Sequence, residues 1–183
     1  MYPADSHLTS LFLAFSREKL LGQYWPRLRK CVEPLADGQI WWRPNDASNS
    51  IGNLILHLNG NVTQWLVDSF NRAENKRNRP AEFAGREHIP AADLLAMLAA
   101  TMGEAGAVLG RLTAEELLAP YEIQGYHVHG LDAVYQVVEH FGLHYGQIAY
   151  IAKALSGQDL GFYSELKQTG RLEAGDTGAS ARP

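Results

Sequence analysis

Apolar residues recur at helical spacing in four long stretches of the chain, and this periodicity constrains its fold more than any other feature. The first stretch carries Pro26 inside its pattern, so we expect one long helix that is kinked or broken there. Ser48, Asn49 and Ser50 precede the second stretch, and any of them can cap it. Gly157 ends the fourth. The stretches are residues 6–35, 51–71, 90–112 and 131–155.

The connections between these stretches predict how the helices are ordered. Residues 74–88 are polar and lack apolar periodicity, and they form a longer link than an antiparallel helix pair requires. A long crossover suggests that helices two and three run parallel. Thr113 and Glu116 resemble a capping box for a short extra turn, and the alternation from Tyr121 to Tyr126 indicates an extended segment. We therefore predict an all-α fold.

Length and composition fit one helical domain. The chain has 183 residues, of which 46% are hydrophobic, and this is enough for a single core. We expect a domain over residues 1–163 and a flexible tail over residues 164–183, because the last residues are small, polar and aperiodic. A net charge of -4 argues against nucleic acid as the main partner.

Cellular location is predicted from what the sequence lacks. The single cysteine, Cys31, cannot form an intramolecular disulfide. The N-terminus shows no targeting signal, and no run approaches the ~18 uninterrupted apolar residues of a membrane span. We expect a cytoplasmic protein that does not span a membrane.

Two histidines stand four residues apart in the fourth stretch. At helical spacing His140 and His144 lie on one face, where they can bind a single metal ion. Phe141 occupies the position that glutamate would hold in an H-E-x-x-H motif, so the sequence does not fit a zinc protease of that class.

Polar side chains on the second stretch match this pair. They flank an apolar stripe and lie near the direction of His57, and the fourth stretch repeats the arrangement. If the two helices pack together, His57, His140 and His144 form a three-histidine metal site with open positions for water or substrate. Five amides would then contact the ligands or the substrate. These are Asn53, Asn61, Gln64, Gln136 and Gln147.

A plainer interpretation stays open. The histidines could form hydrogen bonds with neighbouring helices while the amides fill partly hydrated positions. His127 and His129 precede the fourth helix and could line a rim or face solvent, whereas His7 and His88 are expected at the surface. Cys31 has no nearby base in the sequence, so we expect a structural role.

Two further groups have structural explanations. Trp41 and Trp42 could wall a pocket, but tryptophans in a connection more often anchor it to the core. The basic residues of the crossover alternate with acidic ones, a pattern typical of a solvated, ion-paired linker. This group comprises Glu74, Lys76, Arg77, Arg79 and Glu82.

Two segments carry a resemblance to a known family. They run from Ser48 to Asn61, with His57 near the end, and from Glu139 to Ile148, with His140 and His144. These segments are similar to the metal-binding segments of the DinB/YfiT-like superfamily, and the likeness extends over nearly the whole chain to Tyr163. The resemblance implies an up-down-down-up four-helix bundle, a homodimer, and zinc or nickel at the three histidines. Some relatives are thiol-dependent S-transferases or isomerases, and others are described as metal-dependent hydrolases.

Three functions follow as hypotheses. The leading one is an enzyme in which the metal activates water, or a low-molecular-weight thiol as cosubstrate, against a small electrophilic substrate. The second is a metal-binding or small-ligand-binding protein without catalysis, related to stress. The third is a dimerisation module in which the polar rows are only buried packing.

Overall fold

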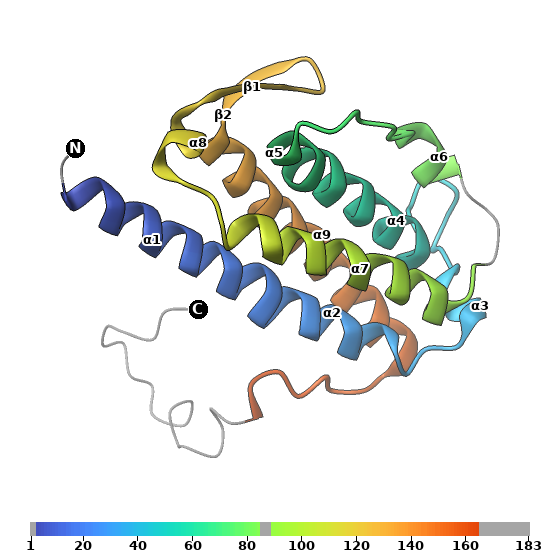
Figure 1. Ribbon diagram of the computed structural model, residues 1–183. Coiled ribbons are helices and arrows are strands. Elements are labelled where there is room, and N and C mark those ends of the chain that lie inside the picture. Colours follow the sequence, from blue (N-terminus) through green and yellow to red (C-terminus); the bar gives the residue numbers. More distant parts are fainter. Residues whose placement is uncertain (1–2, 85–88, 165–183) are drawn as a thin grey trace.

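The computed structural model describes residues 3–84 and 89–164, and it is mostly helical (Figure 1). The first helical segment runs from Pro3 to Val32 without a break, through α1 (Pro3–Arg17), a π-helical segment η1 (Glu18–Tyr24) and α2 (Trp25–Val32). Pro26 lies in the first turn of α2, directly after the π-helical segment. The predicted irregularity is therefore a change of helical pitch before the proline, which has no N–H to donate.

The other three long segments begin and end close to the predicted residues. The second comprises α4 (Ile51–Val62), the π-helical η2 (Thr63–Asp68) and α5 (Ser69–Asn71). Ser50 caps α4, because its hydroxyl accepts a hydrogen bond from the backbone N–H of Asn53. The third segment is α7 (Ala91–Leu109), which follows Pro90, and the fourth is α9 (Gly130–Ser156). α9 ends at Gly157, whose φ of 65° suits glycine.

These segments lie side by side around one core (Figure 1). α4 packs against α7, α9 and α6, and α9 also packs against α2 and η1. In Figure 1, α4 and α7 run in the same direction, from right to left, while α1 and α9 run from left to right. His57 on α4 and His140 on α9 therefore come from adjacent antiparallel helices.

A small two-stranded β-hairpin follows the third long helix. α8 (Ala114–Leu118) begins at Thr113, which forms the predicted capping box with Glu116. Two antiparallel strands follow, β1 (Pro120–Ile123) and β2 (Tyr126–His129). The prediction of one extended segment from Tyr121 to Tyr126 is thus wrong at its centre, where a turn interrupts the extended backbone. There Gln124 and Gly125 have φ values of 56° and 79°. Positive φ at both central residues is typical of a tight hairpin turn.

Two connections, the one before α4 and the crossover after α5, contain short helices that the sequence did not predict. α3 (Asp37–Ile40) precedes α4, and α6 (Arg79–Ala84) lies within the polar connection and packs against α4.

Trp41 is buried and its indole N–H donates to the carbonyl oxygen of Ile89 at 3.0 Å, so it anchors its loop as predicted. Trp42 is 42% exposed and does not. The expected tail after Ser164, and His88, lie outside the described residues.

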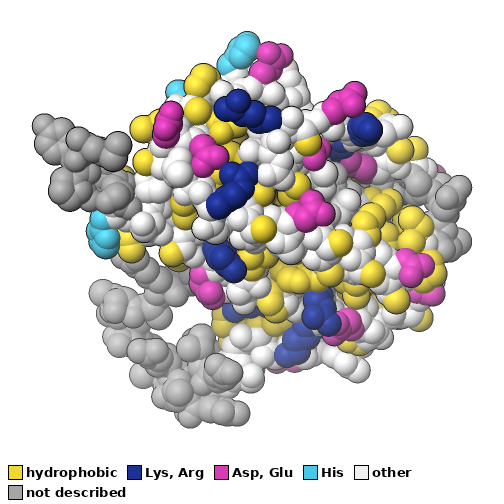
Figure 2. All heavy atoms as spheres, in the orientation of Figure 1, with side chains coloured by type: hydrophobic (Ala, Val, Ile, Leu, Met, Phe, Trp, Pro, Cys, Tyr) yellow, Lys and Arg dark blue, Asp and Glu magenta, His cyan; other side chains and the backbone are white. Residues whose placement is uncertain are grey.

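Charged residues of both signs are interspersed over the face seen in Figure 2, and apolar side chains gather over α7. Among the described residues, α7 is long and apolar enough to cross a membrane by length and composition, with a mean hydropathy of 1.4. Asp93 and Glu104 interrupt the apolar residues of α7, so this helix is not the uninterrupted apolar run that the sequence was found to lack. A helix that contributes to the core of a globular domain meets the same criterion, and Leu94, Leu98 and Met102 of α7 are buried in this core.

Candidate metal centre

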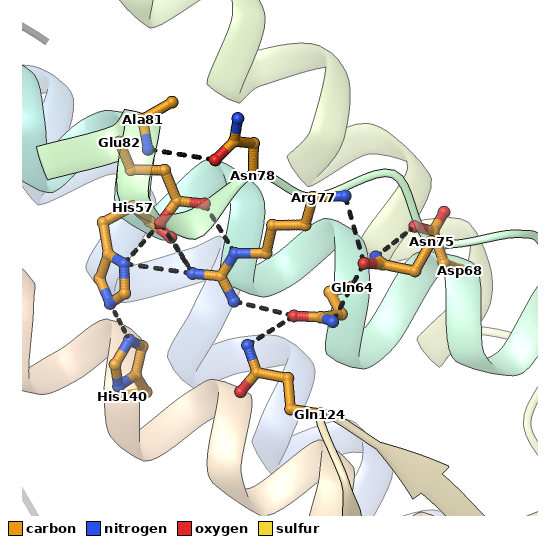
Figure 3. A network of polar contacts seen from close by, with 10 residues as sticks. All are labelled: His57, Gln64, Asp68, Asn75, Arg77, Asn78, Ala81, Glu82, Gln124 and His140. Carbon is orange, nitrogen blue, oxygen red and sulfur yellow. Dashed lines mark hydrogen bonds and ion pairs between the residues drawn. The ribbon is translucent and has the colours of Figure 1, made fainter. Parts of the chain in front are cut away.

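His57, His140 and His144 come together between α4 and α9. One ring nitrogen from each lies within 4.8 Å of the others, and the ring centroids are 4.4 to 4.9 Å apart. The Nε2 atoms of His57 and His140 are 2.9 Å apart (Figure 3). Three imidazole nitrogens at this spacing are a donor set that zinc and other late first-row metals accept.

Glu82 orients the ring of His57. Its Oε2 atom lies 2.8 Å from Nδ1 of His57, and a carboxylate can only accept, so Nδ1 carries the proton. Nη2 of Arg77 is also 3.1 Å from this nitrogen, but it donates to Oε2 of Glu82 at 2.9 Å. A guanidinium cannot accept a hydrogen bond, so Nδ1 does not donate to Arg77. The two nitrogens are close because both donate to Oε2 of Glu82. In the neutral form of the ring, which metal binding requires, the lone pair of His57 is therefore on Nε2, which faces His140.

Gln147 orients His144 in a similar way. Its Oε1 atom lies 2.7 Å from Nδ1 of His144, and because an amide oxygen can only accept, Nδ1 donates to it. The lone pair of His144 is then on Nε2. Metal-binding histidines in proteins commonly donate their other ring N–H to such an acceptor.

Burial keeps two of the rings uncharged. Burial first, and then the neighbouring His144 and His57, together lower the pKa of His140 to about 3. Burial also lowers the pKa of His144, although the hydrogen bond with Gln147 opposes the change. Both rings are thus neutral near pH 7, and a neutral ring is the form that binds metal.

A buried ion pair supports His57 from behind. Nε and Nη2 of Arg77 donate to the two carboxylate oxygens of Glu82 at 2.6 and 2.9 Å, and both side chains are less than 10% exposed. Burial alone would raise the pKa of Glu82, but the hydrogen bonds from Arg77 and His57 outweigh it, so this pKa is lowered. Glu82 is therefore an anion that contacts His57.

Gly60 makes room for this pair. A Cβ atom at position 60 would lie 2.2 Å from Oε1 of Glu82 and 2.8 Å from Nε of Arg77. Gly60 lies one turn of α4 after His57, so the helix that carries the histidine also provides the space for the ion pair.

The interpretation of residues 74–82 as a solvated linker is wrong for Arg77 and Glu82. Glu74 and Lys76 are exposed as expected, but α6 places Glu82 against α4 and Arg77 reaches inward to it. Alternation of charge cannot show burial, because burial here depends on contact with a helix distant in sequence. The one sequence signal was Gly60, a residue without a side chain in a polar row.

The five predicted amides separate into two groups. Asn53 bonds to Ser50 and to the backbone oxygen of Glu82, Gln64 accepts from Arg77 at 3.0 Å, and Gln147 bonds to His144. In contrast, the side-chain oxygens of Asn61 and Gln136 are buried without a hydrogen-bond partner among the described residues. Asn61 follows His57 by one turn of α4, and Gln136 precedes His140 by one turn of α9.

Among the residues that the structure describes, the other candidates are not part of the cluster of three histidines. His7, His127 and His129 are exposed, and His129 precedes α9 with Asp132 as its partner. Cys31 is buried, which raises its pKa to about 11, so it is a poor nucleophile. This agrees with the structural role expected for it.

Two pockets flank the site. One of about 570 Å³ is lined in part by Gly60, Arg77 and Glu82. The other, of about 600 Å³, lies beside Gln147 and includes Leu143 and Tyr150, and none of its lining residues is charged. Both pockets border residues that support the histidines.

Comparison with known proteins places the chain in a family and a fold. No curated protein matches it. A solved structure described as a conserved protein from Enterococcus faecalis is similar, with a TM-score of 0.67 and 15% identity, over 79% of this chain and 97% of that one. At that identity the likeness concerns the fold. A family model described as "Protein of unknown function (DUF1572)" matches residues 7–167, so the chain belongs to the DUF1572 family.

Proposed function

We propose that the protein is a metal-dependent enzyme whose single divalent ion, zinc or nickel, is held by His57, His140 and His144. The observation that carries the proposal is the convergence of three ring nitrogens within 4.8 Å. The hydrogen bonds of His57 with Glu82 and of His144 with Gln147 support it, because they leave Nε2 free on both rings.

The ion would supply a positive charge that favours ionisation of a thiol or water placed against it. Three neutral imidazole rings of the chain would hold the ion. Because these ligands carry no negative charge, the ion would keep its full positive charge. A thiol would come from a low-molecular-weight cosubstrate, because Cys31 is buried with a raised pKa. The reaction would be attack on a small electrophile, as in an S-transferase or a hydrolase.

Asn61 and Gln136 are proposed to contact the substrate. Their buried oxygens lack partners, and such atoms are costly unless a ligand or water satisfies them. Both can only accept, so they would bind an N–H or O–H group of the substrate. The uncharged pocket beside Gln147 favours a neutral molecule.

A non-catalytic metal-binding or ligand-binding protein is the second candidate. The observation that favours it is the state of Glu82, the carboxylate that contacts His57. Both of its oxygens accept from Arg77, so it is poorly suited to take a proton from a substrate.

A panel of small electrophiles, tested with water alone and with several biological thiols, separates the two candidates. Turnover that disappears with chelator and returns with zinc or nickel supports the enzyme. Tight, saturable binding without turnover supports the binding protein and contradicts catalysis.

We also propose the finer architecture that the resemblance implies, an up-down-down-up four-helix bundle of the DinB/YfiT type that forms a homodimer. The parallel course of α4 and α7 favours this topology (Figure 1). Four apolar side chains of α9 are exposed, and we place the dimer interface on this helix: Leu131, Tyr135, Leu143 and Tyr150. Light scattering after gel filtration tests the dimer, and the mass of a monomer at micromolar concentration would contradict it.

A further inference from the structure

A chain of hydrogen bonds links the turn of the β1–β2 hairpin to the ring of His57 (Figure 3). It begins at Gln124, whose Nε2 donates to Oε1 of Gln64 at 2.7 Å. The same oxygen accepts from Nη1 of Arg77 at 3.0 Å. Arg77 holds Glu82, and Glu82 holds Nδ1 of His57. Residues that are 60 positions apart in sequence thus meet behind one candidate metal ligand.

We propose that Arg77 is a positioning residue for His57, and that Gln64 and the hairpin residue Gln124 hold it in place. This inference rests on the proposed metal site, but it concerns residues that would not touch the metal. These hydrogen bonds fix which nitrogen of His57 carries the proton when the ring is neutral.

Arg77 fixes the orientation of the Glu82 carboxylate. Two of its nitrogens engage both oxygens of Glu82, which fixes the plane of the carboxylate, and the third bonds to Gln64. With its plane fixed, Glu82 presents Oε2 to Nδ1 of His57. Rotation of the carboxylate away from the ring would break both bonds from Arg77.

Gln124 holds the side chain of Gln64 in place. Its φ of 56° is unusual for a residue other than glycine, and it occupies the first central position of the turn. This conformation places its side chain against Gln64, which also donates to Asn75 at 3.0 Å. Gln64 is thus fixed by the hairpin on one side and by the crossover on the other.

The first readout is the protonation of His57 in metal-free protein, measured by long-range proton–nitrogen NMR of the imidazole rings. In the wild type we expect the proton on Nδ1. Glu82→Gln leaves one oxygen for which Arg77 and His57 must compete, so we expect a measurable population with the proton on Nε2. A purely structural role would not change this ratio in a protein that still folds.

The second readout is zinc affinity, measured by competition with a chelating dye. We expect a loss of about 10- to 100-fold for Glu82→Gln, as for other residues that orient a metal ligand. Gln64→Leu and Gln124→Asn should each lose severalfold. Gln124→Asn suits the positive φ but has a side chain too short to reach Gln64, so the hairpin should remain intact. Glu122→Ala, an exposed change on β1, is the matched control and should behave as wild type.

The proposal is overturned if folded Glu82→Gln keeps the wild-type proton position, or if Gln124→Asn and Gln64→Leu are indistinguishable from Glu122→Ala. If Glu82→Gln does not fold, the two milder variants decide. Failure of the metal site is a different result, since wild-type protein would then bind no zinc. The NMR measurement would still decide whether the hydrogen bonds from Gln124 through Glu82 position His57.

Discussion

Gly60 and Glu82 are in such close contact that a single methyl group on Gly60 would overlap the carboxylate, at 2.2 Å from Oε1. Glu82 has little freedom to move, because Arg77 and His57 hold both of its oxygens. The α4 helix can therefore carry His57 and the buried ion pair only if position 60 has no side chain.

Gly60→Ala should separate Arg77 from Glu82 and destabilise the protein by about 3 kcal/mol, the usual cost of breaking a buried ion pair. Urea denaturation of the metal-free protein measures this. Gly103→Ala is the matched control, because a Cβ atom there meets nothing within 4 Å. Alanine at that helical position should leave stability unchanged or raise it by up to ~1 kcal/mol. Equal stability of the two variants would contradict the account of Gly60.

The metal-free protein should lose stability as the pH falls below 6.5. His140 has a pKa of about 3 in the folded state and its ordinary value of 6.5 when unfolded, so the unfolded state binds the proton first. The stability that His140 contributes is complete above pH 6.5 and is lost progressively toward pH 3. The lowered pKa values of His144 and Glu82 act in the same direction.

Urea denaturation with chelator between pH 8 and pH 4 measures this dependence. His140→Gln should flatten the decline between pH 6.5 and 4, whereas His127→Gln, an exposed change on β2, should retain it. A wild-type profile that does not change from pH 7 to 4.5 would show that His140 is not held neutral.

Asn61→Leu should leave the metal-free protein as stable as the wild type, or stabilise it by about 1 kcal/mol. The reason is that the Asn61 oxygen is buried without a partner, so its removal costs no protein hydrogen bond. Asn53→Leu is the comparison, because its amide bonds to Ser50 and to the Glu82 backbone, and it should lose about 2 kcal/mol. A similar loss for Asn61→Leu would mean that its oxygen is already satisfied.

The thiol of Cys31 should react slowly with a disulfide reagent in the folded protein and fully only after unfolding. Burial and a pKa of about 11 leave almost no thiolate at pH 7. Cys31→Ala should cost about 1 kcal/mol of stability and leave any thiol-dependent turnover intact. Loss of turnover in a folded Cys31→Ala protein would assign this thiol a chemical role.

The sequence was sufficient for those parts of the site that depend on helical spacing. The four-residue spacing of His140 and His144 places them on one face of α9, and the polar row of α4 brings His57 opposite to them. Helix ends were predictable where a cap marks them, as at Ser50, Thr113 and Gly157.

The support of the site could not be predicted in the same way. Arg77 and Glu82 come from an aperiodic connection, and their burial follows from the packing of α6 against α4 rather than from any local pattern. Gln124 bonds to Gln64 only because a two-residue turn folds β2 back along β1. Such contacts depend on tertiary structure, and only Gly60 marked their position in the sequence.

The metal content of purified protein tests the central claim most directly. After reconstitution with zinc or nickel and removal of excess ion, elemental analysis should find about one ion per chain in the wild type. His57→Ala, His140→Ala and His144→Ala should each lose most of it, while His127→Ala keeps it. An absence of bound metal in the wild type, or equal binding by the three variants, would contradict the assignment of these histidines as a metal centre.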